Sequence, residues 1–237
     1  MARETLVARD EEVAPRSPAP LGMVIVAAGL LGLVAGSAVT GVSVSPFTWY
    51  LARASGFTLY LLLWLSVVAG VGLTTRLLDS IAGRGSLWQV HRASTELAFV
   101  MLALHMTSLA IDPSVRMGLA GVLVRFATHV RELWTGLGIL AAMGMIGIGL
   151  SFWIRRLLRH RGWRLLHYGA FPLWLLALAH GIGVGSDTIR PWAALPYLGT
   201  AGVVVYLTGC RALRAGRRAD LPVPPRGPGV GRVKVSQ

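Results

Sequence analysis

Residues 163–181, WRLLHYGAFPLWLLALAHG, form an apolar run that is long enough for a helix to cross a bilayer. Two histidines in this region, His167 and His180, lie 13 residues apart. A second apolar run, 88–111, carries His91 and His105, which lie 14 residues apart. At about 1.5 Å rise per residue, a helix separates each pair by about 20 Å. Two neighbouring helices of this kind would therefore present histidines at two matched depths.

The composition is typical of a polytopic membrane protein. Of the 237 residues, 54% are hydrophobic and 14% are charged, and the mean hydropathy is +0.62. Apolar runs of about 20 residues recur, which predicts an all-α bundle. The short alternating segments of a membrane β-barrel do not occur. The net charge of +13 is spread over loops and a tail between apolar runs, a pattern that favours anchoring of membrane helices over nucleic-acid binding.

Six transmembrane helices are predicted, with a disordered N-terminal tail (1–20) before them and a basic, disordered C-terminal tail (211–237) after them. The connection 113–133 has room for a short interfacial helix. The six-helix domain occupies 21–210, and its predicted spans are 21–42, 47–73, 87–111, 134–154, 163–184 and 192–210.

The orientation of the bundle follows from the distribution of Lys and Arg. Of the 23 basic residues, 18 fall on the side that holds both tails and 5 on the other side. The more basic side is expected to be cytoplasmic, so both termini are predicted to lie in the cytoplasm. The helices over 87–111 and 163–184 then both run outward, which places His91 and His167 near the inner face and His105 and His180 near the outer face.

The two depth-matched pairs predict axial ligands for two haems, because imidazole readily binds iron. The single cysteine, Cys210, leaves no Cys-x-x-Cys-His motif for covalent attachment, so the haem would be b-type. Two alternatives stay open: histidines that hydrogen-bond to neighbouring helices, and a single occupied pair. Thirteen residues leave His180 about 140° from His167 on an ideal helix. Pro172 lies between them, and a kink there is predicted to re-aim His180.

Several arginines are candidate partners for haem propionates. Arg92 and Arg164 are placed for an inner haem, although anchoring of the helices explains their positions equally well. Arg53 is placed for an outer haem, together with Arg125 or Arg131. Arg53 is the more telling residue, because it opposes the positive-inside trend and sits inside an apolar run.

Other polar and aromatic residues receive more ordinary predicted roles. Glu96, which is costly at membrane depth, is expected to be protonated or to bond a neighbouring helix, with a proton path as the alternative. Phe99 and Trp174 are expected to pack between the two histidine depths. The remaining assignments are helix caps at the outer face for Asp112 and Asp187, and loop positions for His129 and His160.

The segments VHRASTELAFVMLALH (90–105), WRLLHYGAFPLWLLALAHG (163–181) and LARASGFTLY (51–60) resemble the ferric reductase-like transmembrane domain family. That family includes ferric reductases, the membrane part of NADPH oxidases and the haem-binding subunit of a methionine sulfoxide reductase system. The resemblance covers about 47–210. It implies two b haems between the third and fifth helices, with the four histidines as axial ligands and Arg53 near the outer haem.

Ferric reductases and NADPH oxidases continue into a flavin and nicotinamide domain, whereas the 27 residues of 211–237 contain no Gly-rich fingerprint for one. The expected electron donor is therefore a partner protein, a flavin on a partner or weakly bound, or a membrane quinol.

The sequence thus predicts a transmembrane b-type cytochrome in the plasma membrane, the electron-transfer component of an oxidoreductase, which delivers electrons to an unknown acceptor at the outer face. The alternatives are a reductase of iron or oxygen at the outer haem edge, and a cofactor-free structural protein or metal-ion transporter.

Overall fold

A computed structural model describes residues 46–75, 77–115, 118–123 and 131–219, together with the isolated positions 29, 32 and 36. Within these ranges the only regular secondary structure is helical. The predicted N-terminal tail and the predicted span 21–42 lie outside the described residues, apart from the three isolated positions. The helices are α2 (Phe47–Thr75), α3 (Arg84–Ile111), α4 (Gly118–Leu123), α5 (Glu132–Ser151), α6 (Arg159–Tyr168), α7 (Ala170–Val184) and α8 (Pro191–Ala219).

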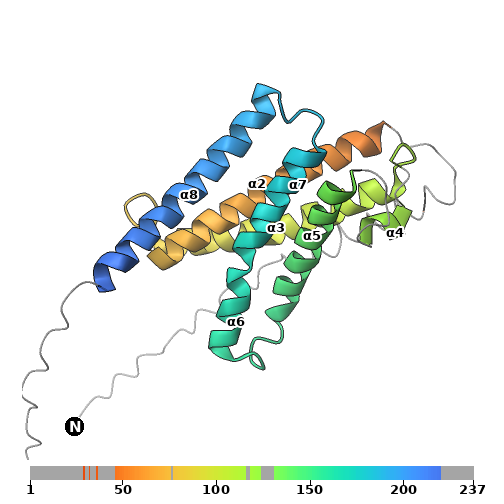
Figure 1. Ribbon diagram of the computed structural model, residues 1–237. Helices are drawn as coiled ribbons and strands as arrows, with labels where there is room; N and C mark the ends of the chain where they lie inside the picture. The colour runs from red at the N-terminus through yellow and green to blue at the C-terminus, as the bar shows by residue number, and fades with distance from the viewer. Residues whose placement is uncertain are drawn as a thin grey trace, which may run out of the picture.

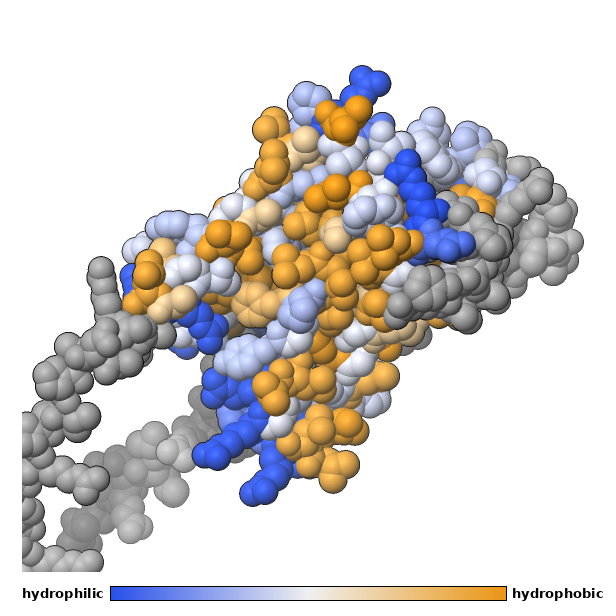
Figure 2. Space-filling model, in the orientation of Figure 1, coloured by the Kyte–Doolittle hydropathy of each residue, from blue (hydrophilic) through white to orange (hydrophobic). Residues whose placement is uncertain are grey.

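Five segments of the described chain are long and apolar enough to cross a membrane: α2, α3, α5, α6 with α7, and most of α8. Hydrophobic side chains cover most of the coloured surface in Figure 2, and hydrophilic ones gather towards its ends. This distribution is that of helices solvated by lipid in the middle and by water at their termini. The chain is accordingly an integral membrane protein with an α-helical bundle.

The bundle is organised around α2, which packs along α3 and also contacts α7 and α8. The second close pair is α5 with α7, as Figure 1 shows. Small and apolar side chains of α3 and α5 form one buried cluster: Ala98, Leu102, Ala142 and Met145. A second cluster joins α2, α7 and α8 through Tyr60, Trp174 and Val204. These contacts hold α3 and α7, which carry three of the four predicted ligands, in a fixed relation to α2 and α5.

The predicted single helix over 163–184 is two helices, α6 and α7, which meet at Gly169. The break follows from Pro172, because a proline ring clashes with the carbonyl four residues earlier, here that of Tyr168. The Gly169 amide bonds instead to the Leu166 carbonyl at 2.9 Å, three residues back. The predicted deviation between His167 and His180 is therefore present, but it lies three residues before Pro172. The helix also starts earlier than predicted, at Arg159, so that His160 is helical.

The prediction of a disordered C-terminal tail from residue 211 onward is wrong for 211–219, because α8 continues through this segment to Ala219. This segment, RALRAGRRA, consists mostly of alanine, leucine and arginine, which are strong helix formers. The prediction of disorder rests on the basic, Gly- and Pro-rich composition of 211–237 as a whole, whereas the prolines and all but one of the glycines lie after residue 219. In the connection 113–133, the described part contains the short helix α4 (Gly118–Leu123).

A buried carboxylate joins α2 to α3 at the predicted outer end. Asp112, the C-cap residue of α3, is 2% exposed. It accepts hydrogen bonds from the Thr48 hydroxyl at 3.0 Å and from the Ser114 amide at 2.8 Å and hydroxyl at 2.5 Å. Burial on its own would raise the pKa of Asp112, but these hydrogen bonds outweigh it and hold the pKa below its ordinary value.

Replacing Asp112 by asparagine is expected to lower the free energy of unfolding at pH 7 by about 1–3 kcal/mol, because bonds to a buried charged acceptor are lost. A lowered pKa in the folded state stabilises the protein above the ordinary carboxyl pKa, and this stabilisation disappears as the pH falls through the folded value. Thermal unfolding in detergent between pH 7 and pH 3 should therefore show a shallower acid loss for Asp112→Asn. Asp79→Asn, at an exposed site, is the control. Equal acid slopes for Asp112→Asn and wild type would refute this assignment.

Candidate functional site

The four predicted ligand histidines meet in two pairs, one on each side of the middle of the bundle. The ring centroids of the inner pair, His91 (α3) and His167 (α6), lie 5.9 Å apart. Those of the outer pair, His105 (α3) and His180 (α7), lie 6.3 Å apart. The two rings of each pair are nearly perpendicular, at 81° and 80°. The structure thus brings together the same partners that the sequence predicts.

Both rings of the outer pair are anchored by backbone carbonyl oxygens. His105 Nδ1 lies 2.8 Å from the Ala52 oxygen in α2, and His180 Nδ1 lies 2.8 Å from the Trp134 oxygen in α5. A carbonyl oxygen can only accept, so each Nδ1 carries the hydrogen. Each Nε2 is then left with a free lone pair, which is the form of imidazole that binds a metal.

His91, in the inner pair, is held by a closed ring of hydrogen bonds. The Thr95 hydroxyl donates to the His91 carbonyl at 2.7 Å, so towards the Ser66 hydroxyl, at 2.8 Å, it acts as acceptor. The Ser66 hydroxyl therefore donates its hydrogen to the Thr95 hydroxyl, and its oxygen accepts a hydrogen bond from His91 Nδ1 at 3.0 Å. The Ser66 carbonyl, at 2.9 Å, accepts from the same nitrogen. These directions leave His91 Nε2 unprotonated as well.

A glycine follows each anchoring carbonyl by four residues, and its missing side chain makes room for the imidazole. A Cβ at Gly56, four residues after Ala52, would lie 2.9 Å from the His105 ring. A Cβ at Gly138, four residues after Trp134, would overlap the His180 ring. At Gly70, four residues after Ser66, a Cβ would lie 3.5 Å from the His91 ring, which is ordinary contact. Each unit of carbonyl and glycine forms a cradle for one histidine.

The sequence pattern does not reveal the cradles directly, although it contains a signal for two of them. Ala52 and Ser66 lie 14 residues apart in α2, the same spacing as His91 and His105 in α3. Antiparallel helices with equal spacings match one cradle to each histidine. Glycine is so common in the apolar runs that the pattern becomes visible only when the helices are placed side by side.

His167 differs from the other three histidines. Its Nδ1 has no hydrogen-bond partner in the part of the chain that the structure describes. The ring stacks on Trp163, one turn earlier in α6, at 5.1 Å between centroids and 17° between planes. The Nε1 atoms of Trp163 and Trp174 are buried without a partner among the described residues. A buried indole N–H that lacks an acceptor beside a candidate ligand is a donor available to a bound group.

The two arginines proposed most directly as propionate partners have protein partners. Arg53 is paired with Asp187, donates to the Ser186 hydroxyl at 2.8 Å and lies 4.3 Å over the Trp49 ring. Arg92 pairs with Glu96, one turn along α3, at 2.8 Å. Glu96 is therefore accounted for within its own helix. Both pairs are partly exposed, and neither excludes a further contact to a bound group.

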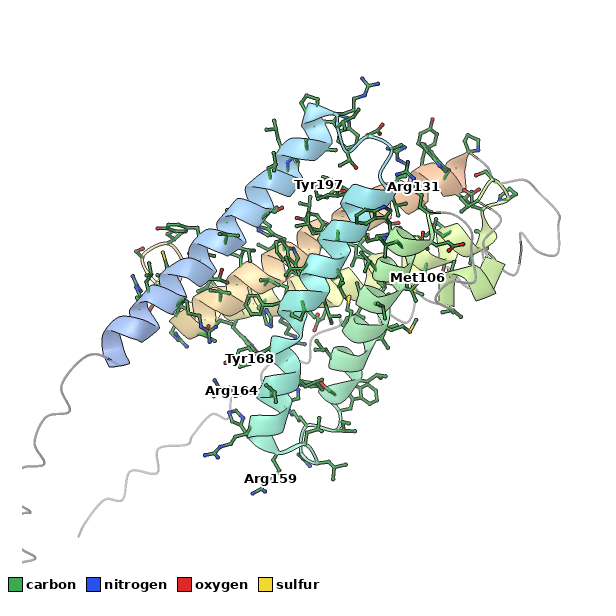
Figure 3. The ribbon with its side chains drawn as sticks, in the orientation of Figure 1. Met106, Arg131, Arg159, Arg164, Tyr168 and Tyr197 are labelled. Carbon is green, nitrogen blue, oxygen red and sulfur yellow. The ribbon has the colours of Figure 1, made fainter. Side chains whose placement is uncertain are left out.

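Three further arginines are predicted propionate partners. Arg164 donates to the Tyr168 hydroxyl at 3.0 Å, within α6. Arg131 precedes α5 and donates to the Gly183 carbonyl of α7 at 2.5 Å. Figure 3 shows Arg131 and Tyr197 at the end of the bundle opposite Arg159 and Arg164. Arg125 lies outside the described residues.

The other predicted roles have mixed outcomes. Trp174 is 3% exposed and stacks on Tyr60, and Phe99 packs on the cluster of α3 and α5, so both fill the space between the histidine depths. Asp187 is not a helix cap, because its carboxylate is taken by Arg53, while Gly185 is the C-cap residue of α7. His129 lies outside the described residues.

The geometry of the pairs fits a metal held between two imidazoles. With about 2 Å from metal to each nitrogen and about 1.2 Å from nitrogen to ring centroid, the two centroids would lie about 6.4 Å apart. The observed centroid separations are 5.9 and 6.3 Å. The described residues contain no group of three or more His, Cys, Asp or Glu side chains that would hold a bare ion. Each pair supplies two imidazoles, the ligand type that would hold the iron of a b-type haem.

Comparisons with protein-family models, with curated proteins and with solved structures found no match to this chain. The resemblance of 51–60, 90–105 and 163–181 to the ferric reductase-like family stays a prediction. What the structure adds to it is the geometry of the four histidines and their cradles.

Proposed function

We propose that this chain is a transmembrane b-type cytochrome with two haems, one between His91 and His167 and one between His105 and His180. It passes electrons across the plasma membrane, with both termini in the cytoplasm, from a cytoplasmic donor protein or a quinol to an acceptor at the outer face. It would act as the membrane component of an oxidoreductase. The observation that carries the proposal is the pair of imidazole spacings, 5.9 and 6.3 Å, at two depths of one membrane bundle.

The anchoring of the rings supports this proposal over purely structural histidines. A structural histidine in a membrane uses its ring nitrogens to bond neighbouring helices. Within the part of the chain that the structure describes, His91, His105 and His180 use only Nδ1 in this way, and their Nε2 atoms have no hydrogen-bond partner. These Nε2 atoms are not among the buried unpaired side-chain atoms of the described residues, so they remain accessible to a bound group. Metal ligation explains why three separate histidines share this arrangement.

The chain's own residues would bind, orient and insulate the cofactor. The cradles fix the ring orientation of three ligands, and apolar side chains between the two depths exclude water from the path. The buried N–H of Trp163 is a candidate donor to a propionate of the inner haem. Haem iron, when bound, supplies the one-electron redox chemistry.

The first test is a reduced-minus-oxidised spectrum with pyridine haemochrome quantification on the purified protein. Two b haems per chain are expected in wild type, and about one in His105→Ala and in His167→Ala. His160→Ala, at an exposed histidine of α6, is the control and should keep both. A folded wild-type protein without haem would reject the proposal, and metal-ion binding would then be measured.

The hydroxyl of Ser66 is expected to tune the inner haem in the loaded protein. In Ser66→Ala the backbone carbonyl still anchors His91, so both haems should remain bound. The imidazole loses one acceptor, becomes a weaker donor to iron and should raise the inner midpoint potential. One net hydrogen bond of about 0.5–1.5 kcal/mol corresponds to a shift of roughly 20–65 mV for one electron. Potentiometric titration measures the shift, and Ser151→Ala, whose hydroxyl donates to the Ile148 carbonyl of its own helix, is the control. An unchanged inner potential would show that the hydroxyl does not act on the iron.

A further inference from the structure

Resting on the proposed function, the structure points to a difference between the two haem sites. Three of the four ligands are fixed by a hydrogen bond from Nδ1 to a carbonyl, at 2.8 or 2.9 Å. The glycine of each cradle leaves space for the imidazole ring against the helix that contains the glycine. In the outer pair both ligands are fixed in this way, whereas in the inner pair only His91 is.

The helix that carries His167 is also the most weakly held of the described elements around the site. None of the ten residues of α6 is buried. Its main neighbours are α5 and α7, and in Figure 1 it extends beyond α2, α3 and α8. It begins at Arg159, which has a left-handed backbone (φ 54°), and it ends at the break at Gly169. A helix with few buried contacts between two irregular joints can move at low free-energy cost.

Among the described residues, the ring contacts of His167 are the stack on Trp163 and the perpendicular contact with His91. Hydrogen-bonding partners behind a metal-bound histidine typically contribute about 10- to 100-fold to metal affinity. Aromatic stacking contributes less, roughly 2- to 10-fold. His167 is therefore expected to be the most easily replaced of the four ligands.

We propose that His167 is an exchangeable ligand and that the inner haem, alone of the two, accepts an external ligand in its place. The ligand class is a small neutral π-acceptor such as carbon monoxide, which binds reduced iron. The exchange breaks one iron–nitrogen bond and forms one iron–carbon bond, with no change of oxidation state. The outer haem, with both histidines in cradles, stays closed. The inner site then combines electron transfer with ligand binding on the side where the donor docks.

The experiment uses the full chain with both haems in lipid nanodiscs, reduced with dithionite and mixed with carbon monoxide. The Soret change should correspond to about half of the haem. His105→Ala, which keeps only the inner haem, should react almost completely. His91→Ala, which keeps only the outer haem, should not react. Trp163→Ala should raise the rate of binding roughly 2- to 10-fold, while Leu165→Ala, at a 75% exposed position of the same helix, should leave it unchanged.

The outcomes separate this inference from the function on which it rests. A protein without haem would reject the proposed function itself. A protein with two haems that ignores carbon monoxide would keep the proposed function and overturn the exchange of His167. A carbon monoxide reaction that survives in His91→Ala would place the open site at the outer haem and would also overturn it.

Discussion

Replacing Gly138 by alanine is expected to remove the outer haem and leave the inner one. A Cβ at this position would overlap the His180 ring. That ring cannot move aside without losing its 2.8 Å hydrogen bond to the Trp134 carbonyl. Loss of such support typically lowers metal affinity about 10- to 100-fold, and here the ring itself is displaced. Pyridine haemochrome analysis should give about one haem per chain, with the spectrum of His105→Ala.

The same helix offers a matched control. Gly147 also lies in α5, and a Cβ there would meet nothing within 4 Å. Both substitutions remove a glycine from a helix, which on its own favours the helix by up to about 1 kcal/mol. Gly147→Ala should therefore retain both haems with equal or higher thermal stability. A difference between the two variants isolates the cradle from any general effect of alanine in α5.

The three cradles also predict a graded series. Gly56→Ala would place a Cβ 2.9 Å from the His105 ring and should weaken the outer haem. Gly70→Ala, at 3.5 Å from the His91 ring, should be tolerated. Equal haem contents in Gly138→Ala, Gly56→Ala and Gly70→Ala would mean that the cradles do not govern binding.

The helical architecture was predictable because it depends on long apolar runs, which a bilayer requires of any spanning helix. The runs at 47–73, 87–111 and 134–154 match α2, α3 and α5 to within a few residues. The partners of the histidine pairs were predictable for a related reason, since charge asymmetry sets direction and direction sets depth. Both inferences depend on the hydrophobicity and the charge summed over each segment, and neither requires knowledge of how the side chains pack.

The partners of single side chains were not predictable in this way. The pairing of Arg53 with Asp187, 134 residues away, was not predicted. The cradle of His180 joins α5 to α7 through a backbone oxygen, Trp134 O, which leaves no mark on residue type. Such contacts depend on the rotation of each helix about its axis. A membrane helix is apolar on all sides, so its sequence pattern does not specify that rotation.

The largest conformational effect is expected from restoring a continuous helix between α6 and α7. On an unbroken helix, His180 would lie about 140° from His167, so both could not face α3. The break at Gly169 removes this conflict, and two residues support it. Pro172 excludes the carbonyl of Tyr168 from the helical pattern. A Cβ at Gly169 would lie 2.8 Å from the Leu166 carbonyl oxygen in the broken form.

The double variant Gly169→Ala with Pro172→Ala favours the continuous helix from both sides. Because α7 is packed against α2 and α5 while α6 has no buried residue, α6 should rotate and carry His167 away from His91. The inner haem should then be lost and the outer haem retained, as haem content and the spectrum of His167→Ala would show. Pro196→Ala, which removes a proline from inside α8, a helix without ligands, controls for proline removal itself. Two haems in the double variant would mean that the break arises from packing around α6 and not from these two residues.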